Sequence, residues 1–493
     1  MSTQENMDKA HWSASMSRRI VERVVVQADL VLRSPARLGN GDADEQTDMP
    51  LLLDAKDRRP LLQGTSLAGA LRAHYRRVVG TENTTLFGVS KGSDEGEQSA
   101  LIVDDAYGGG KWGIEHRDGV VLDPQTRTAA PGLLYDFDVW TAGTIFKVRF
   151  ELLIREGQDR VALRQALGTA LRGLSDGGIT LGGRKSRGLG MLLLKDARVT
   201  TYDLRTPAGL LGWLRDDGSA VEGLATLGHV ERVADDELRV RLTMKLLEGG
   251  VLVRGNSGRD DIGADAVQLQ TRDENGHDKP VIPGTSLAGA LRGRALRIAR
   301  TLEAADKSAD ALVNRLFGIM PNGANGSKIA SRVRVSEALL TGVTTNYVQN
   351  RVSIDRFTGG ALDTALFSEQ PGLPEKSDAG TVIEFRVART SAAERALLLF
   401  VMKDLCLGDL PIGGTISLGR GRLQAVGGEI SCDGKKWKFK QHEKGRLEFD
   451  EGDAASLNAL ADGAALRTAL GATQSATQGA TQSATQSATK GGN

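Results

Sequence analysis

Apolar and polar positions alternate along the chain in two similar series. The first opens with an apolar stretch at 21–32 and the second with one at 237–247, and both have the pattern of a β-strand. After a long polar loop, each series continues with apolar residues three and four positions apart, the spacing of an amphipathic helix. These helical positions are Leu67, Ala70, Leu71, Tyr75 and Val78 in the first series, and Leu287, Ala290, Leu291 and Ile298 in the second.

The remainder of each series predicts the same elements in the same order. The first continues with a strand at 145–154, a helix at 161–174 and a strand at 191–194, and the second with 382–387, 392–405 and 422–426. A glycine-rich loop precedes the last strand in both. This strand–helix–strands–helix–strand order predicts an α+β, ferredoxin-like domain. A sheet of this kind also underlies the commonest module for binding single-stranded RNA.

Identical sequence accompanies this shared order. GTSLAGALR occurs at 64–72 and again at 284–292, and Leu-Phe-Gly recurs at 86–88 and 316–318. The loop GGRKSRGLG (182–190) corresponds to GGTISLGRG (413–421), and between these landmarks lie RDGVVLD from Arg117 and RVSID from Arg351. The chain is therefore predicted to be a tandem duplication of a domain of about 200 residues.

The repeats and the composition define six segments. We expect an N-terminal extension at 1–18, a first domain at 19–203, a linker at 204–235, a second domain at 236–431, a C-terminal extension at 432–470 and a tail at 471–493. Asp433-Gly434 predicts a two-residue hairpin turn at the start of the C-terminal extension. The tail repeats ATQS-like units with few apolar residues, so it is predicted to be disordered.

Overall charge says little about the partner. With 63 basic and 62 acidic residues the formal net charge is +1, so a nucleic-acid site would have to be a local basic groove. Only two cysteines occur, Cys406 and Cys432. Neither a disulfide framework nor a zinc site is expected from them, which fits a reducing compartment. No apolar run reaches the ~18 residues of a membrane span and no secretory signal precedes the first strand. A cytoplasmic protein without a membrane partner is expected.

The glycine-rich loops are candidates for binding RNA phosphates. Glycine lets backbone N–H groups approach a phosphate chain, and Lys185 and Arg187 in the first loop, with Arg420 and Arg422 in the second, would supply counter-charge. The alternative is a tight helix-to-strand connection. Basic residues in both copies favour the RNA interpretation, and neither loop has the spacing of a nucleotide-binding P-loop.

The repeated GTSLAGALR segments are a second candidate. Hydroxyl and N–H groups at a helix N-terminus can seat a phosphate. Helix capping and core packing explain the same residues and, taken alone, explain them better. The candidate contacts are Thr65, Ser66 and Arg72 in the first copy, and Thr285, Ser286 and Arg292 in the second.

Acidic residues cluster in the loop before each GTSLAGALR. The clusters are Asp42, Asp44 and Asp48 in the first loop, and Asp260, Asp261 and Asp265 in the second. Such carboxylates can hold a divalent ion or orient a nucleophile for phosphodiester cleavage, although loop aspartates more often only solubilise a loop. The six histidines show no metal-binding spacing. His116-Arg117-Asp118 has the letters of a kinase catalytic triplet, but no partner motif supports a kinase.

These motifs together resemble the RAMP superfamily of CRISPR-associated proteins, specifically the backbone subunits of type III effector complexes. The resemblance rests on PGTSLAGALR at 283–292, the Leu-Phe-Gly tripeptide, NRVSIDR at 350–356 with TGGA at 358–361, ALF at 365–367 and the glycine-rich loop. Together they cover most of both domains. The first domain departs from the pattern at Gln63, where the second has Pro283, and at Arg127-Thr128-Ala129.

The resemblance implies an RNA-recognition-like fold with a β-hairpin thumb that kinks the guide–target duplex. The segments around Arg117 and Arg351 would form the two thumbs, with Arg351 among the RNA-binding residues. It also implies one loop aspartate per domain that promotes metal-dependent cleavage of target RNA, with Mg²⁺ or Mn²⁺ as cofactor. That aspartate matches Asp48 in the first domain and Asp265 in the second, with Asp260 and Asp261 as contenders.

The implied partners are a CRISPR guide RNA, a complementary target RNA and further effector subunits. Two fused backbone domains resemble the type III-D or III-E arrangement. An inactive backbone scaffold is one alternative. A guide-processing ribonuclease of the same superfamily, which would be independent of metal ions, is the other.

Overall fold

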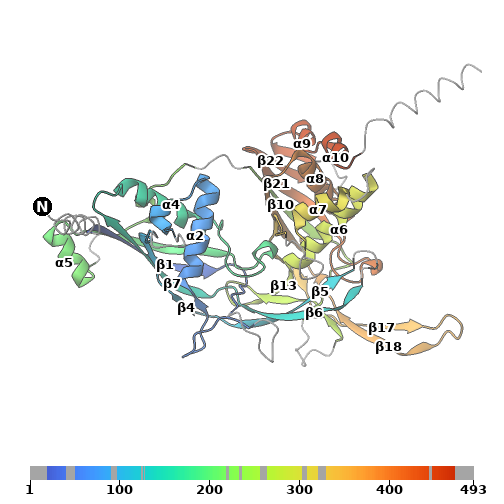
Figure 1. The fold of residues 1–493 in the computed structure, drawn as a ribbon. Helices are drawn as coiled ribbons and strands as arrows, with labels where there is room; N and C mark the ends of the chain where they lie inside the picture. Colours follow the sequence, from blue (N-terminus) through green and yellow to red (C-terminus); the bar gives the residue numbers. More distant parts are fainter. Residues whose placement is uncertain are drawn as a thin grey trace, which may run out of the picture.

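The computed structural model describes residues 19–39, 50–89, 97–123, 126, 128–217, 221–231, 236–255, 264–302, 308–319, 329–442 and 447–471. Two α+β units follow each other along the chain, with β-hairpins along one side (Figure 1). The N-terminal extension, almost all of the predicted tail, and three candidate aspartates (Asp48, Asp260 and Asp261) lie outside the described residues.

The first unit is built on a central strand, β1 (Ile20–Leu32). It pairs antiparallel with β7 (Ile145–Arg155) on one side and β8 (Leu192–Asp203) on the other, and β3 (Leu101–Val103) extends the sheet beyond β7. The helices α2 (Gly64–Val79) and α4 (Arg160–Ser175) pack together, and their apolar faces are buried in the same core as these strands. Fully buried side chains from both layers include Val24, Leu30, Leu67, Leu71, Phe150 and Leu167.

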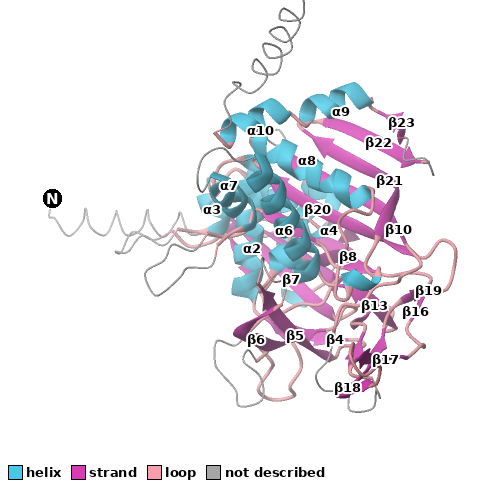
Figure 2. Cartoon of the chain, turned by 90° about the vertical axis from the view of Figure 1, so that its right-hand side faces the viewer, coloured by secondary structure: helices cyan, strands magenta, loops and turns pink. Residues whose placement is uncertain are grey.

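The second unit repeats this arrangement. Its central strand β10 (Glu237–Leu246) lies between β20 (Gly380–Ala388) and β21 (Leu423–Cys432). Strand β14 (Val333–Val335) pairs with β20 as β3 pairs with β7. Helices α6 (Gly284–Leu302), α7 (Ser308–Phe317) and α8 (Ala392–Cys406) lie against the sheet (Figure 2). The repeat in the sequence is therefore a repeat in the structure.

Each unit carries a long hairpin in its central segment. In the first it is β5 (Ile114–Leu122) with β6 (Ala129–Trp140), and in the second β17 (Gln349–Ile354) with β18 (Ala361–Gln370). The β5–β6 hairpin runs beneath the second unit, whereas β17–β18 projects away from the body (Figure 1). Both predicted thumb segments thus form hairpins.

Short elements complete the two units. They are β2 (Leu61–Leu62), α3 (Thr84–Phe87), β4 (Ala106–Gly109), β11 (Ala266–Val267), β12 (Gln270–Arg272), β13 (Asp278–Ile282), β15 (Ala338–Leu339), β16 (Val343–Thr344) and β19 (Leu373–Pro374).

The segment predicted as a linker folds onto the first unit. It contains α5 (Pro207–Arg215), β9 (Val221–Glu222) and the 3₁₀ turn η2 (Leu224–Leu227). Strand β9 pairs with β8, and buried Leu227 joins the first core. At Gly168 of α4 a side chain would meet the Gly228 carbonyl oxygen at 2.2 Å, so this close contact requires glycine.

The C-terminal extension belongs to the second core. Strands β22 (Lys435–Gln441) and β23 (Leu447–Glu451) extend its sheet, and helices α9 (Ala454–Leu460) and α10 (Gly463–Ala469) pack on α8. Asp433 and Gly434 have φ values of 50° and 76°, as a two-residue turn with two left-handed residues requires. The predicted hairpin is confirmed, and Trp437, Leu466 and Leu470 are buried in this core.

Two truncations should distinguish this folded extension from the repeats on its C-terminal side. Removing residues 472–493 is expected to leave the melting temperature unchanged, because ATQ-type repeats have no large apolar side chains to bury. Removing everything after Glu451 should lower it markedly, because Leu457, Leu466 and Leu470 leave the core. Thermal denaturation of the two truncated chains tests this, and equal melting temperatures would contradict it.

None of the helices in the described ranges is both long and apolar enough to cross a lipid bilayer.

Candidate RNA interface and active site

The two glycine-rich loops have the same backbone conformation. Gly183 donates its N–H to the Arg37 carbonyl at 2.7 Å, and Gly414 donates to the Leu252 carbonyl at 2.7 Å. Both loops then enter a 3₁₀ turn, η1 (Lys185–Arg187) or η3 (Ile416–Leu418), through a left-handed residue, Arg184 or Thr415. Because Gly183 and Gly414 make equivalent hydrogen bonds, these two positions correspond. Arg184, Lys185 and Arg187 then correspond to Thr415, Ile416 and Leu418. By the same alignment, Leu189 corresponds to Arg420.

The first loop lines a pocket of about 400 Å³ together with the start of α2. Ser66 and Lys185, two of the predicted RNA contacts, both face it, and so does Arg37. The loop needs glycine here, because a side chain at Gly182 (φ 84°) would meet the Arg37 carbonyl oxygen at 2.2 Å. Arg37 was missed from sequence, because only the folded loop brings it beside residues almost 150 positions away.

Arginines continue from this pocket into the second unit. Arg184 stacks on Phe137 with 4.3 Å between guanidinium carbon and ring centre, and Arg187 reaches across the unit boundary to Ser331 Oγ (3.3 Å) and the Val333 carbonyl (3.4 Å). Burial and the charges of Arg292 and Arg184 lower the pKa of Arg187. Among the described residues Arg187 forms no ion pair.

We call this set the basic ridge. It comprises Arg37, Arg184, Lys185, Arg187 and Arg292. Burial and Arg184 likewise lower the pKa of Arg37, so like charges repel one another along the ridge. A polyanion would relieve that repulsion, which makes the ridge a suitable surface for a phosphate backbone.

Helix α2 does not begin with the side-chain cap that the capping interpretation assumes. Gln63 is the N-cap of α2 and makes no side-chain cap bond. The Gly64 N–H donates to Asp105 Oδ1 at 2.7 Å, and the Ser66 N–H to the Gln63 carbonyl at 3.1 Å. These amides are therefore already bonded within the protein. The hydroxyls of exposed Thr65 and half-buried Ser66 remain as the polar groups facing outward.

In the second unit Thr285 is also exposed and Ser286 half-buried. Arg292 donates to Asn314 Oδ1 at 2.8 Å. Arg72, its equivalent in the first unit, instead pairs with Glu82 at 2.5 Å and lowers the pKa of that carboxyl. Arg292 thus has a neutral partner where Arg72 has an acidic one.

Arg420 is buried, in contrast to the phosphate-binding role predicted for it. It is 2% exposed and donates to Glu369 Oε2 at 2.7 Å and Gln349 Oε1 at 2.6 Å. Arg351 pairs with the same carboxylate at 2.9 Å. These bonds give Arg420 and Arg351 a structural role at the root of the β17–β18 hairpin. Arg422 is exposed.

Backbone pairing also changes how the two hairpins correspond. Trp140 pairs with Ala36, and Gly372 pairs with Val251, the equivalent of Ala36. Trp140 and Gly372 are therefore equivalent positions. Three residues earlier in the chain are Phe137, which pairs with Arg117, and Glu369, which pairs with Gln349. Arg117 thus corresponds to Gln349 rather than to Arg351.

Arg117 fastens the two units together. It is 4% exposed, donates to Thr271 Oγ1 at 2.8 Å, and forms an ion pair with buried Glu337. Glu115, two residues earlier, accepts the Arg272 N–H at 2.8 Å. Its buried position makes Arg117 an inter-unit anchor.

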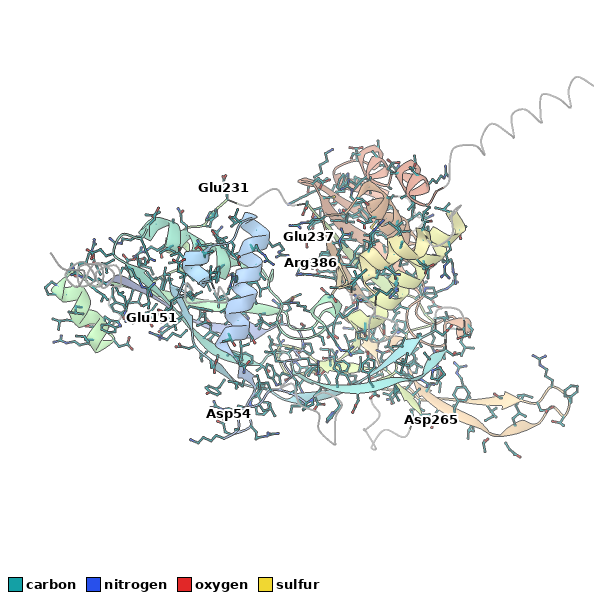
Figure 3. The ribbon with its side chains drawn as sticks, viewed as in Figure 1. Asp54, Glu151, Glu231, Glu237, Asp265 and Arg386 are labelled. Atoms are coloured by element: carbon teal, nitrogen blue, oxygen red, sulfur yellow. The ribbon has the colours of Figure 1, made fainter. Side chains whose placement is uncertain are left out.

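Asp265 is fixed to the β17–β18 hairpin. Its Oδ2 accepts the Ser368 N–H at 2.7 Å and the Ser368 Oγ–H at 3.0 Å, and its own N–H donates to Ser368 Oγ at 3.0 Å. Hydrogen bonding from the Ser368 backbone, and then from its hydroxyl, lowers the pKa of Asp265. Its carboxylate is therefore anionic at neutral pH. Asp265 lies at the base of the projecting hairpin (Figure 3).

A pocket of about 490 Å³ surrounds Asp265 at the boundary between the units. The first unit contributes β5 residues to its lining, including Glu115, His116 and Asp118, and the second contributes the segment from Ala264 to Arg272. The side chain of this predicted catalytic residue thus faces a cavity to which both units contribute.

Asp48 occupies the equivalent position in the sequence of the first unit. The bridges Gly39–Leu51 and Arg254–Gln268 correspond, as do the bonds from Leu52 N–H to Leu38 and from Leu269 N–H to Val253. Leu51 therefore matches Gln268, and the residues three positions earlier are Asp48 and Asp265. In this alignment Asp48 and Asp265 correspond directly, without inserting or deleting a residue between them and the matched bridges.

No group of three or more acidic, histidine or cysteine side chains suited to a metal ion occurs within the described ranges. Mg²⁺ is commonly held by one or two carboxylates together with substrate phosphates. Asp265, anionic and facing a pocket, fits a cation shared with RNA.

The two units also match a known protein family. Residues 29–192 and 243–424 each match the RAMP superfamily model, in agreement with two similar α+β units. The chain belongs to the RAMP superfamily. Membership indicates a CRISPR-associated role in binding RNA, which confirms the resemblance found in the sequence at the level of the superfamily. No curated protein matches the chain.

Proposed function

We propose that the chain is a guide-RNA-binding backbone subunit of a type III CRISPR antiviral effector complex, and that it cleaves complementary target RNA at loop aspartates. The basic ridge is the observation that carries the first part. Its five cations lie on neighbouring surfaces of both units, so a single RNA strand would follow the boundary between them.

The order of elements supports the same proposal. The helices and strands of both units fit the β-α-β-β-α-β order expected of a ferredoxin-like domain. The β17–β18 hairpin exposes apolar side chains, with Phe357 97% and Leu366 72% exposed. Such side chains could displace a nucleotide from a duplex, as a thumb does.

The boundary between the units suggests how further effector subunits bind. Loop η1 packs against α6 and β14 of the second unit. The equivalent loop η3 has exposed Leu418 in place of Arg187. We expect a further subunit to bind over η3 and the projecting β17–β18 hairpin. At that boundary Leu418 would make apolar contacts, where Arg187 makes polar contacts at the boundary within this chain.

Cleavage is proposed at Asp265, and at Asp48 by its equivalent position. The low pKa of Asp265 suits a fixed anion that orients the 2′-hydroxyl or holds a cation, because a carboxylate of low pKa is a poor proton acceptor at neutral pH. A bound Mg²⁺ or Mn²⁺ would stabilise negative charge on the scissile phosphate.

Salt-dependent binding tests the ridge. Replacing Lys185 and Arg292 by alanine should weaken guide-RNA binding and reduce the slope of log affinity against log salt by about 0.7 for each lost phosphate contact with a single strand. The double variant Lys436→Ala/Lys438→Ala is the control, because it removes two exposed cations from β22 in the C-terminal extension. Equal slopes for both double variants would refute the ridge as the RNA surface.

A further inference from the structure

His116 stands in the Asp265 pocket, contributed by the other unit. It lies on β5, lines the cavity, and its side chain is 67% exposed. On the neighbouring strand β6, Asp138 is its direct cross-strand partner. The imidazole Nδ1 lies against the Asp138 carboxylate. That contact orients the ring and leaves Nε2 as the nitrogen available to a ligand.

The strand carrying His116 is fixed to the second unit. Side chains alternate along β5, so Glu115 and Arg117 point to one face and His116 and Asp118 to the other. Glu115 accepts from Arg272 N–H and Thr271 Oγ1, and Arg117 pairs with Glu337. These contacts lie on either side of His116 along β5, so the backbone that carries His116 is fixed to the second unit.

The histidine is specific to the first hairpin. The register that aligns Arg117 with Gln349 places Val348 at the position of His116, and Val348 cannot transfer a proton. Among the described residues that line the pocket, the other charged groups are Glu115, Asp118, Arg254, Asp265, Arg272 and Asp278, of which Arg272 and Asp278 pair at 3.8 Å. None of them is a natural proton donor at neutral pH, whereas a histidine is.

We propose that His116 is the general acid for the cut made at Asp265, so that the active site is shared between the two units. This inference rests on the proposed cleavage function. The 2′-hydroxyl, oriented by Asp265, attacks phosphorus and loses its proton to solvent water. The bond from the 2′-oxygen to phosphorus forms as the bond to the 5′-oxygen breaks. His116 Nε2–H gives its proton to that departing oxygen. The products are a 2′,3′-cyclic phosphate and a 5′-hydroxyl end.

The test uses the full chain loaded with guide RNA and two target RNAs. One target has an ordinary scissile linkage and the other has sulfur in place of the bridging 5′-oxygen, a leaving group that needs no proton. With the ordinary target, His116→Ala should slow the Asp265-dependent cut by about 100-fold or more, the usual contribution of a general acid. With the sulfur target it should cut within a few-fold of the unmodified chain. His277→Ala, which removes an exposed histidine outside the pocket, is the control and should not change either rate.

The outcomes separate this inference from the proposed function. An unchanged rate for His116→Ala with the ordinary target would overturn the inference, as would equal slowing with both targets, which would indicate a positioning role. Retention of the cut by Asp265→Ala would overturn the cleavage proposal itself. Target binding by each variant, measured in the same preparations, shows whether the complex has assembled.

Discussion

Replacing Arg420 by alanine is expected to destabilise the second unit by about 3–5 kcal/mol, the cost of leaving one partner of a buried ion pair without the other. Glu369, 1% exposed, would keep a charge surrounded by protein, and of its two cationic partners among the described residues it would retain Arg351. Urea denaturation of the variant and the unmodified chain measures the loss of stability.

The first unit supplies the design of a rescuing variant. There Leu189 and Phe137 occupy the positions of Arg420 and Glu369, and they form a small apolar cluster with Val139. The double variant Arg420→Leu/Glu369→Phe should therefore recover most of the stability lost by Arg420→Ala. Arg422→Ala, at an exposed neighbouring position, is the control and should lie within about 0.5 kcal/mol of the unmodified chain. A stable Arg420→Ala variant that binds guide RNA weakly would instead assign Arg420 to the RNA surface.

Removing the Asp265 carboxylate should abolish one of the cuts in the target RNA, with a loss of rate of at least about 100-fold. Asp265→Asn is the sharper change, because its amide oxygen can still accept hydrogen bonds from Ser368 while the negative charge is lost. Affinity for the target should change little, since a carboxylate does not attract phosphate. Denaturing gel electrophoresis of end-labelled target gives the position and rate of each cut.

A variant of the equivalent aspartate, Asp48, and a chelator of divalent ions provide the comparisons for Asp265→Asn. Asp48→Asn should remove a different cut and leave the Asp265-dependent one, and a chelator of divalent ions should suppress both. If both single variants keep every cut, Asp260 and Asp261 are the next positions to replace. If replacement of all four leaves cleavage intact, the loops are only solvated connections and the chain is a scaffold.

Much of the fold could be predicted from the sequence because the same motifs occur twice in the same order. The central strands and the helices α4 and α8 were predicted within one or two residues of their observed ends, for example 161–174 for α4 at Arg160–Ser175. For α2 and α6 only apolar positions were predicted, and α6 continues beyond the last of these, Ile298, to Leu302. Helix α7 was not predicted. The final strands were predicted too short, because Leu192–Asp203 continues into mixed polar sequence on an exposed face. The segment 204–235 was predicted as a linker because it lies between the two repeated domains, and the sequence alone did not show that residues such as Leu227 return to the first core.

The candidate site could be predicted from the sequence only in part. The sequence identified Ser66, Lys185 and Asp265, which face pockets, but it did not distinguish them from Arg420, which is buried. A basic residue in a glycine-rich loop looks the same whether a carboxylate distant in sequence neutralises it or not. The role of Arg117 was hidden for the same reason, because its partners belong to the other unit. The importance of His116 was equally hidden, because its pocket forms only when the units pack together.

Ultraviolet crosslinking of bound guide RNA, followed by mass spectrometry of the crosslinked peptides, tests the central claim most directly. If the RNA follows the basic ridge, crosslinked peptides will come from the first glycine-rich loop around Lys185, from the segment around Arg37, and from the start of α6 up to Arg292. Crosslinks confined to other surfaces, such as β22 and β23 or helix α5, would contradict the account.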